Sequence, residues 1–218
     1  MMDIELTLNG VAQRVTCAPG DSLMTVLRRL GCFSVRYGSE TGETGAAAVL
    51  VDGRLLAADV LLAAQADGHE VTTVESLNVA TGELHPIQAA FVESGALQSG
   101  YSAGAMVLAT KALLERVPDP SEWEIRDAFS GILDRETGYV KVVDAVQRAA
   151  ALLRGEKPEP MAPVLVERLT DGGAAGADGS LPDAPAAMPR LVPSADVPVT
   201  NVVGKSAHKV DAIKLVKG

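Results

Sequence analysis

The sequence predicts an α+β fold, in which a small sheet domain is followed by a helical domain and an extended tail. Residues 1–77 contain short alternating apolar segments separated by Asn-Gly and Asp-Gly pairs, which are typical of β-hairpins. Residues 84–153 carry apolar side chains at helical spacing, interrupted by Pro and Gly. Residues 155–198 are dominated by Pro, Gly and Ala, a composition that cannot bury a core.

The N-terminal segment is predicted to form a hairpin followed by a short helix. Apolar residues alternate on both sides of Asn9-Gly10, which favours two strands joined by a type I′ turn. Asp21-Ser22 is expected to cap a helix that ends at Gly31. The apolar face of this helix is predicted to consist of Leu23, Val26, Leu27 and Leu30.

Further strands are predicted after a Gly-rich loop at residues 38–45. Residues 46–51 and 54–56 are the next two strands, turned by Asp52-Gly53, and residues 71–74 are the last short strand. Strands wrapped around one helix indicate a β-grasp, ferredoxin-like domain over residues 1–77.

Four helices are predicted in the next region, and helices of this length form a compact four-helix bundle. The first begins near Pro86 and ends at Gly95, and the second spans residues 103–117. Ser121-Glu122-Trp123-Glu124 is a capping box that opens a third helix, ending near Gly131. The fourth carries the apolar stripe Val142, Val143, Val146, Ala149 and Leu153.

The C-terminal quarter of the chain is predicted to be extended. Residues 155–198 are expected to be a linker. Residues 199–218 regain apolar spacing but are too short to fold alone, so we expect this tail to pack on a partner chain.

Composition excludes several functions. The net charge of −9 argues against a nucleic-acid or anionic-membrane surface. No run of apolar residues is long enough for a transmembrane helix, and the N-terminus lacks a basic segment followed by an apolar one. With two cysteines in dissimilar contexts, no disulfide framework is expected, and a cytoplasmic location is the default.

Residues 30–31 are Leu-Gly, residues 38–53 read GSETGETGAAAVLVDG, and residues 56–63 read LAADVLLA. These motifs resemble those of the iron–sulfur small subunit of the xanthine oxidase (molybdenum hydroxylase) family. That family has an LG–x–K–x–GC–x–x–G–x–CGAC–TVL–x–DG run, and residues 30–31 and 38–53 keep its glycines, Ala46 and the VL–x–DG ending. The V–x–SCL–x–LA pattern that follows corresponds to residues 56–63.

Two motifs in the helical region resemble the same family. LHP–x–Q–x–AF–x–E–x–GA–x–QCGYC corresponds to residues 84–102, and IR–x–ALSGNLCRCTGY corresponds to residues 125–139. The resemblance therefore covers about residues 3 to 153, and it implies a β-grasp domain followed by a four-helix domain.

The resemblance implies eight cysteine ligands for two [2Fe–2S] clusters, but other residues stand at those positions. The first set is Ser39, Thr44, Ala47 and Asp59, and the second is Ser99, Ser102, Asp134 and Glu136. Neither Cys17 nor Cys32 falls on a ligand position. Because clusters need thiolates, with His an occasional substitute, we expect no [2Fe–2S] cluster and no resident metal in this chain.

Two alternatives remain for these positions. The second set offers only oxygen donors, which suit a hard cation such as Ca²⁺ or Mg²⁺. The favoured alternative is that both cavities have closed around small or hydrogen-bonding side chains, with Asp134 or Glu136 paired with Arg135 or Arg126. Cys32 is expected to be a buried apolar cysteine without catalytic function.

The tail carries a second resemblance, to the opening of the family's large molybdenum-cofactor subunit. That subunit begins VGKS–x–x–R–x–DA–x–x–KVTG, and the tail has VGKS at residues 203–206 followed by DAIKLVKG at residues 211–218. A cleaved fused precursor and a re-partitioned gene both explain it. The partner implied by the resemblance is a molybdopterin-binding large subunit, within a higher hetero-oligomer. Gln98 is expected to contact the pterin, the alternative being an ordinary helix-end glutamine.

The expected function follows from these resemblances, since no catalytic residue is identified in the chain itself. The first hypothesis is a structural, non-electron-transferring subunit, with redox-neutral or direct-acceptor chemistry at the partner's molybdopterin and no FAD subunit. The second is a non-enzymatic assembly or protein-binding module derived from the iron–sulfur subunit.

Overall fold

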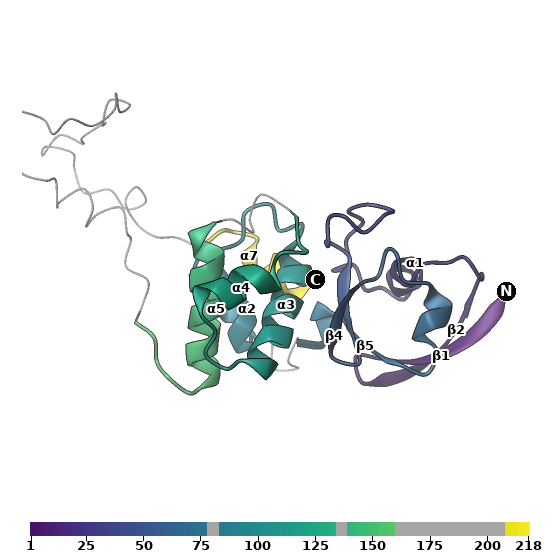
Figure 1. Ribbon diagram of the computed structural model, residues 1–218, viewed down its shortest axis with the longest axis horizontal. Coiled ribbons are helices and arrows are strands. Elements are labelled where there is room, and N and C mark those ends of the chain that lie inside the picture. Colours follow the sequence, from purple (N-terminus) through teal and green to yellow (C-terminus); the bar gives the residue numbers. More distant parts are fainter. Residues whose placement is uncertain (78–82, 134–138, 160–207) are drawn as a thin grey trace, which may run out of the picture. The chain divides into compact units, whose positions relative to one another are not determined.

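The protein has the predicted α+β architecture. The computed structural model describes residues 1–77, 83–133, 139–159 and 208–218. Met1–Pro158 and His208–Gly218 form one compact unit. Sheet and helices occupy separate parts of this unit (Figure 1).

The N-terminal part is a mixed five-stranded sheet with the order β2-β1-β5-β3-β4. β1 pairs with β5 in parallel, and the other pairings are antiparallel. The strands are β1 (Met2–Leu8), β2 (Val11–Cys17), β3 (Ala48–Val51), β4 (Arg54–Ala57) and β5 (Glu70–Thr72). Two short 3₁₀ helices accompany them, η1 (Ala63–Ala66) and η2 (Val74–Leu77).

Both predicted hairpin turns are present. Asn9 and Gly10 have φ values of 52° and 80°, and Asp52 and Gly53 have φ values of 47° and 76°. Two consecutive residues with positive φ define a type I′ turn, which Asn-Gly and Asp-Gly adopt with little strain. These turns set the register, with Leu8 opposite Val11 in the first hairpin.

The helix α1 (Leu23–Arg29) begins as predicted, since the Ser22 hydroxyl accepts the Thr25 N–H at 3.2 Å. The predicted apolar face is wrong at one position. Leu30 lies beyond the end of the helix and is 38% exposed, because the chain turns there toward Gly31. Met24 is buried in α1 together with Leu23, Val26 and Leu27.

The last predicted strand ends earlier than expected. β5 stops at Thr72, and Val74 begins η2 instead of continuing the sheet. The physical reason is packing, because Val74 and Leu77 are buried in the same hydrophobic cluster as the helices. The chain therefore leaves the sheet after Thr72, and its next apolar residues pack in the helical core.

Each of the four predicted helical segments contains a helix. The helices are α2 (Pro86–Glu93), α3 (Ala103–Arg116), α4 (Glu122–Ala128) and α5 (Val140–Leu153). Ser121 caps α4 by accepting the Glu124 N–H at 3.3 Å, while the Glu124 carboxylate accepts the Ser121 N–H at 2.7 Å. The helix α4 ends before Gly131, at Ala128, and Phe129 is its C-cap.

The end of the tail packs on its own chain, which the sequence did not predict, while the expected packing of residues 199–218 on a partner stays a prediction. Residues 212–217 form α7, which contacts α2 and α3 and is seen beside those helices in Figure 1. Ala212 and Val216 lie one helical turn apart and are 2% and 0% exposed. The predicted linker from residue 160 onward, and residues 199–207, lie outside the described part of the chain.

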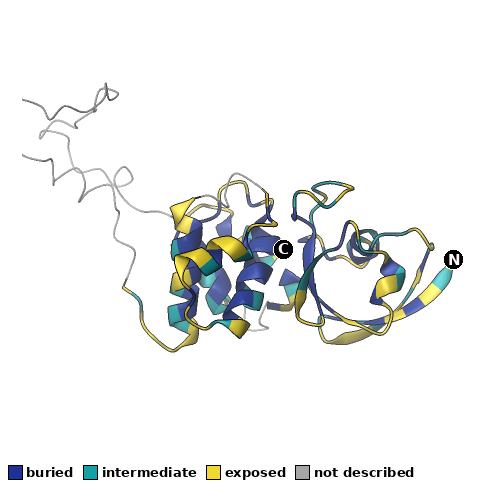
Figure 2. Cartoon of the chain, in the orientation of Figure 1, coloured by how far each residue is buried: buried dark blue, intermediate teal, exposed yellow. Residues whose placement is uncertain are grey.

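Two hydrophobic clusters stabilise the fold. One fills the space between the sheet and α1, and the other joins α2, α3, α4, α5 and α7 with Ala48 and Leu50 of β3. Figure 2 shows buried residues on the inward faces of both regions. Among the described residues, no helix has the length and apolar character needed to cross a membrane.

Candidate functional site

The Gly-rich loop at residues 38–47 brings two of the predicted site residues together. The Ser39 hydroxyl donates to Asp59 Oδ2 at 3.4 Å and accepts the Gly42 N–H at 3.0 Å. Gly42 and Gly45 have φ values of 82° and 64°, a region that glycine enters without steric cost. The glycines therefore let the loop turn back on Ser39.

Ala47 and Thr44 lie in the same loop. The Ala58 N–H donates to the Ala47 carbonyl at 3.0 Å, so Ala47 is held beside the residue that precedes Asp59. Thr44 Oγ1 accepts the Ala46 N–H at 3.4 Å, and it lies so close to Gly38 that a Cβ there would come within 2.0 Å of it. The four positions of the first set thus belong to one compact neighbourhood.

Asp59 is the chemically distinctive member of this neighbourhood. It is 7% exposed, and its Oδ1 has no hydrogen-bond partner in the part of the chain that the structure describes. A buried carboxylate oxygen without a partner is energetically costly. The hydrogen-bonding capacity of Asp59 Oδ1 is therefore unsatisfied by the described residues around it.

The second set is described only in part. Ser99 and Ser102 lie in the connection between α2 and α3, where the Ser99 hydroxyl accepts the Tyr101 N–H at 3.1 Å and Ser102 is 1% exposed. Asp134 and Glu136 lie outside the described residues. Of their expected partners, Arg126 forms an ion pair with Glu122 at 2.7 Å, one turn earlier in α4, and the pairing of Asp134 or Glu136 stays a prediction.

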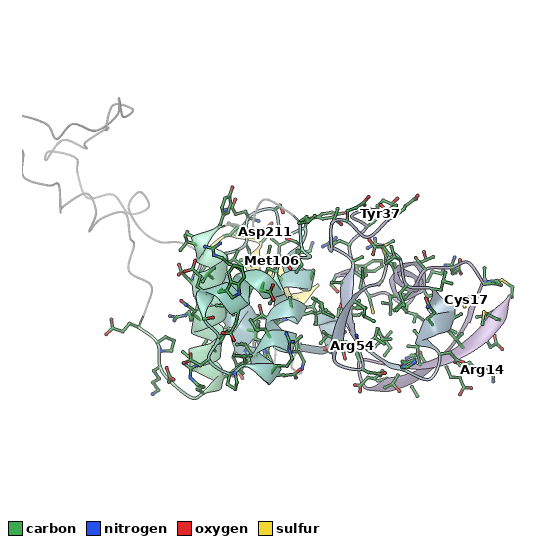
Figure 3. All side chains as sticks on the ribbon, in the orientation of Figure 1. Arg14, Cys17, Tyr37, Arg54, Met106 and Asp211 are labelled. Atoms are coloured by element: carbon green, nitrogen blue, oxygen red, sulfur yellow. The ribbon has the colours of Figure 1, made fainter. Side chains whose placement is uncertain are left out.

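Gln98 is exposed in the connection between α2 and α3. Nearby, the Tyr101 hydroxyl donates to the Tyr37 carbonyl, which ties this connection to the loop that precedes Ser39. Figure 3 shows Tyr37 in that loop. The segments that carry both sets of predicted positions are therefore joined by a direct contact.

Neither cysteine falls on one of these positions, and both are buried. Cys17 ends β2 and is 0% exposed, and Cys32 follows α1 and is 5% exposed; both are free thiols. Burial raises the pKa of Cys32, Glu75 raises it further, and a hydrogen bond with Thr73 opposes the shift. A thiol with a raised pKa is a poor nucleophile and a poor ligand at neutral pH.

Comparison with known proteins identifies the family. Residues 73–147 match the family described as "[2Fe-2S] binding domain". The small FeS subunit of nicotinate dehydrogenase from Eubacterium barkeri is 40% identical over 147 residues, which are 67% of this chain and 93% of that protein. The chain belongs to the xanthine oxidase family of [2Fe–2S] small subunits.

Other members of the family are similarly close. The iron–sulfur-binding subunit of xanthine dehydrogenase from Escherichia coli is 38% identical over 66% of this chain and 91% of that protein. The aldehyde oxidoreductase structure from Desulfovibrio desulfuricans superimposes with a TM-score of 0.68 at 38% identity, over 72% of this chain and 18% of that larger one. The structure of quinoline 2-oxidoreductase from Pseudomonas putida 86 gives a TM-score of 0.66 at 34% identity, over 98% of that chain.

These findings correct the expectation about cofactors. The chain was expected to have no [2Fe–2S] cofactor, but its family is a [2Fe–2S] binding domain and its relatives are FeS subunits. Within this small subunit, the residues at the positions implied by the resemblance do not fit such a cluster. Ala47 has no donor atom and is 0% exposed, while Ser39, Thr44 and Asp59 offer oxygen where iron–sulfur clusters take thiolates.

Sequence reasoning missed one residue of this small subunit's loop, Glu43. The pKa of its carboxylate is lowered, chiefly by a hydrogen bond from the Thr41 hydroxyl and then by a backbone N–H. The alternation of acidic and hydroxyl residues from Ser39 to Thr44 was the available signal. The run alone predicts only an ordinary polar loop, and its contact with Asp59 is apparent only in the structure.

Proposed function

We propose that this chain is the small subunit of a molybdenum hydroxylase complex and that its role there is structural. Its partner is a large subunit that binds molybdopterin, within a higher hetero-oligomer. The single observation that carries the structural role is the donor set at the predicted ligand positions. Ala47, buried completely, puts a methyl group where a thiolate is required, and the three residues near it supply only oxygen.

The arrangement of the first loop supports a role as a scaffold. The Leu133 N–H donates to the Thr44 carbonyl at 2.9 Å, so the segment after α4 is bonded to the Gly-rich loop. The packing is equally close at Gly45, where a Cβ would lie 2.1 Å from the Gly131 carbonyl oxygen. Such contacts fix the two loops against each other, which supports a structural role.

The reaction belongs to the partner chain in this proposal. If electrons do not leave through the small subunit, the catalytic cycle closes at molybdenum, by redox-neutral chemistry or by an acceptor that reaches the metal directly. Gln98 is proposed to hydrogen-bond the pterin across the interface, and its exposure supports this role. An amide side chain can both donate to and accept from a pterin edge.

The packing of α7 bears on the alternative function. Because the last described helix is seated on α2 and α3 of its own chain, the tail is no longer an argument for permanent assembly with a large subunit. A protein-binding or assembly module therefore remains the second candidate, and co-purification separates the two.

The test is purification of the complex through an affinity tag on the full-length chain, expressed in its native host. The partner is identified by mass spectrometry, and molybdenum and iron are counted per chain. The proposal expects a molybdopterin protein at about equal stoichiometry, and no reduction of this chain at the catalytic rate when substrate is added. Recovery of the chain without a molybdenum protein supports the assembly module instead. A [2Fe–2S] signal that forms at the catalytic rate overturns the structural role.

A further inference from the structure

The surface of the helical region that α7 covers is a compact seat for one short helix. Figure 1 shows α7 beside α2 and α3, and α7 also contacts η2. Ala212 and Val216 lie one helical turn apart and are 2% and 0% exposed. Ile213, on the other face of the helix, is 54% exposed. One face of α7 therefore makes the contact with the rest of the chain.

Two residues of the seat hold the backbone and a side chain of α7. The Gln88 Nε2 donates to the Val216 carbonyl oxygen at 2.8 Å, and Gln88 is fully buried. At Gly100, a Cβ would come within 2.5 Å of the Leu215 side chain. The seat therefore combines a hydrogen-bond donor for the helix backbone with a position that only glycine leaves open.

The buried positions of α7 are fixed in the pattern of large subunits that the tail resembles. Residues 211–218 resemble DA–x–x–KVTG, in which Ala, Val and Gly correspond to Ala212, Val216 and Gly218. The first two are buried. A Cβ at Gly218 would lie 2.8 Å from Glu75 Oε1, so the chain passes close to η2 at that point. Three fixed positions of the pattern therefore lie against the body of the chain.

The other positions of this pattern lie away from the centre of the contact. Ile213 and Lys214 stand at the two positions that the pattern leaves free, and both are exposed. Asp211 precedes the helix and is exposed as well. The tail departs from the pattern at Leu215 and Lys217, which are partly buried. The large-subunit pattern thus coincides with the face of the helix that the seat contacts.

The seat belongs to the body that this chain shares with small subunits. The motif LHP–x–Q–x–AF–x–E–x–GA–x–QCGYC, which residues 84–102 resemble, has Gln and Gly at the positions of Gln88 and Gly100. The nicotinate dehydrogenase small subunit of Eubacterium barkeri is matched over 93% of its own length by 67% of this chain. That protein has no room for a counterpart of the remaining third. The seat is therefore not a feature that requires a tail in the same chain.

We propose that this seat is the docking site for the opening segment of the partner large subunit, and that α7 fills the site in cis. The segment is recognised by its backbone carbonyl at the Gln88 amide, by two apolar side chains one helical turn apart, and by a glycine that passes Glu75. This inference rests on the proposed function, which supplies the large subunit as partner.

The cis arrangement makes the site competitive. A segment that is joined to its own binding site by a flexible linker acts at an effective concentration on the order of 1 mM. Residues 155–198 have the composition expected of a linker. A large subunit that carries such a segment of its own therefore has to displace α7 before it can dock there.

The failure of this inference is distinguishable from the failure of the proposed function. Its test uses only this chain and synthetic peptides, whereas the proposed function is tested by co-purification. Absence of peptide binding together with a co-purified molybdenum protein would overturn the docking site alone. Peptide binding without such a protein would support the docking site and overturn the proposed partner.

The experiment measures the binding of fluorescent peptides to full-length chains by anisotropy. The tail peptide has the sequence of residues 203–218. The opening peptide carries Lys209→Arg, Leu215→Lys and Lys217→Thr in addition, which give it the large-subunit pattern. In the chain, Val216→Asp releases α7, because it places a carboxylate where the side chain is 0% exposed.

We expect the opening peptide to bind the Val216→Asp chain one to one, and at least tenfold more tightly than it binds the parent chain, whose seat is filled. Adding Gln88→Leu should weaken this binding about tenfold, since it removes the hydrogen bond to the peptide backbone. The matched control is Ile213→Asp, which puts the same charge on the exposed face of α7. This chain should bind no more peptide than the parent does.

A version of the opening peptide that carries Val216→Asp should not bind. Equal binding of the opening peptide by the parent and Val216→Asp chains overturns the proposal. Binding of the tail peptide without binding of the opening peptide overturns the large subunit as the occupant. If the Val216→Asp chain folds poorly, the opening peptide should restore its helical circular dichroism, and a lack of restoration equally overturns the site.

Discussion

The side chain of Gln88 donates from Nε2 to the carbonyl oxygen of Val216 at 2.8 Å, across 128 residues of sequence. Both residues are 0% exposed. The same amide accepts the His85 N–H through Oε1 at 3.0 Å, so one glutamine both caps α2 and binds α7. This is the hydrogen bond through which the end of the chain becomes part of the helical core.

Replacing Gln88 with Leu should lower the free energy of unfolding by about 1–3 kcal/mol. The variant keeps the size of the side chain but leaves the His85 N–H and the Val216 carbonyl without a partner in a buried place. The measurement is urea denaturation followed by circular dichroism. The matched control is Gln147→Leu, on the exposed face of α5, which should stay within about 0.5 kcal/mol of the parent. Equal effects of the two substitutions would contradict the role assigned to Gln88.

Gly100 should be intolerant of a side chain because Leu215 of α7 packs against it. A Cβ at Gly100 would come within 2.5 Å of the Leu215 side chain, and its φ of 72° already disfavours other residues. Gly53 has a φ of 76° and nothing within 4 Å, so Gly53→Ala measures the backbone strain alone, about 1–2 kcal/mol. Gly100→Ala should lower the free energy of unfolding by about 1–3 kcal/mol more than Gly53→Ala does, which is the usual cost of overpacking.

The clash has its own test in a double-mutant cycle. In a protein that carries Leu215→Ala, Gly100→Ala should lose its additional cost, because the clashing side chain is gone. The cost of Gly53→Ala should be the same with and without Leu215→Ala. The readout is again the free energy of unfolding in urea. Strictly additive effects of Gly100→Ala and Leu215→Ala would mean that α7 does not rest on this loop in solution.

Stability should fall as the pH is lowered through about 6.5, in part because of His85. Burial lowers its pKa below the ordinary value of 6.5, and the charge of Lys111 lowers it further. The unfolded chain therefore binds a proton at His85 more readily than the folded chain does. The contribution of His85 to the free energy of unfolding is complete above pH 6.5 and is lost as the pH falls from 6.5 through the lower pKa of the folded chain. The His85 Nδ1 also accepts the Ile87 N–H at 3.3 Å, which protonation would prevent.

The variant that isolates this effect is His85→Asn. Asparagine can cap the helix in the same way but does not titrate, so its free energy of unfolding should depend less on pH between about 5 and 7. His69 and His208 remain in both proteins, and the difference between the two curves therefore reports His85 alone. Parallel curves would show that His85 is protonated equally in the folded and unfolded chains.

Sequence reasoning reached the local structure more easily than the long-range contacts. Asn9-Gly10, Asp52-Gly53 and the Ser121 capping box each act within a few residues, and each is present as predicted. Leu30 and Val74 were misplaced because their environment is set by where the chain turns in three dimensions, which periodicity does not encode.

The same limit applied to the candidate site and the tail. Motif spacing named Ser39 and Asp59 as candidates, but the hydrogen bond between them and the unsatisfied Oδ1 depend on how the loop folds back. The packing of α7 was missed because the spacing of Ala212 and Val216 shows an apolar face but not what covers it. Asp134 and Glu136 stay predictions, since they lie outside the described residues.

Replacement of Gln98 should affect the partner's cofactor and leave the fold of this chain unchanged. Gln98 is exposed between α2 and α3, so Gln98→Ala should keep the parent free energy of unfolding. In the purified complex, loss of a pterin hydrogen bond should alter the Mo(V) electron paramagnetic resonance spectrum and weaken cofactor retention about three- to tenfold, corresponding to roughly 0.5–1.5 kcal/mol. Gln147→Ala is the control. Identical spectra and molybdenum content would favour the ordinary helix-end glutamine.

Restoring thiolates at the first set of positions should create a site that binds an iron–sulfur cluster. The quadruple variant Ser39→Cys, Thr44→Cys, Ala47→Cys and Asp59→Cys supplies four sulfur ligands at the positions that the resemblance implies. After anaerobic reconstitution it should bind about two more irons per chain than the parent carried through the same procedure. The single variant Ala47→Cys, which lacks the other three thiolates, should not. If the quadruple variant folds only with iron, recovery of its helical circular dichroism on reconstitution is the readout. Equal iron in the single and quadruple variants would show that these four positions do not surround one cluster.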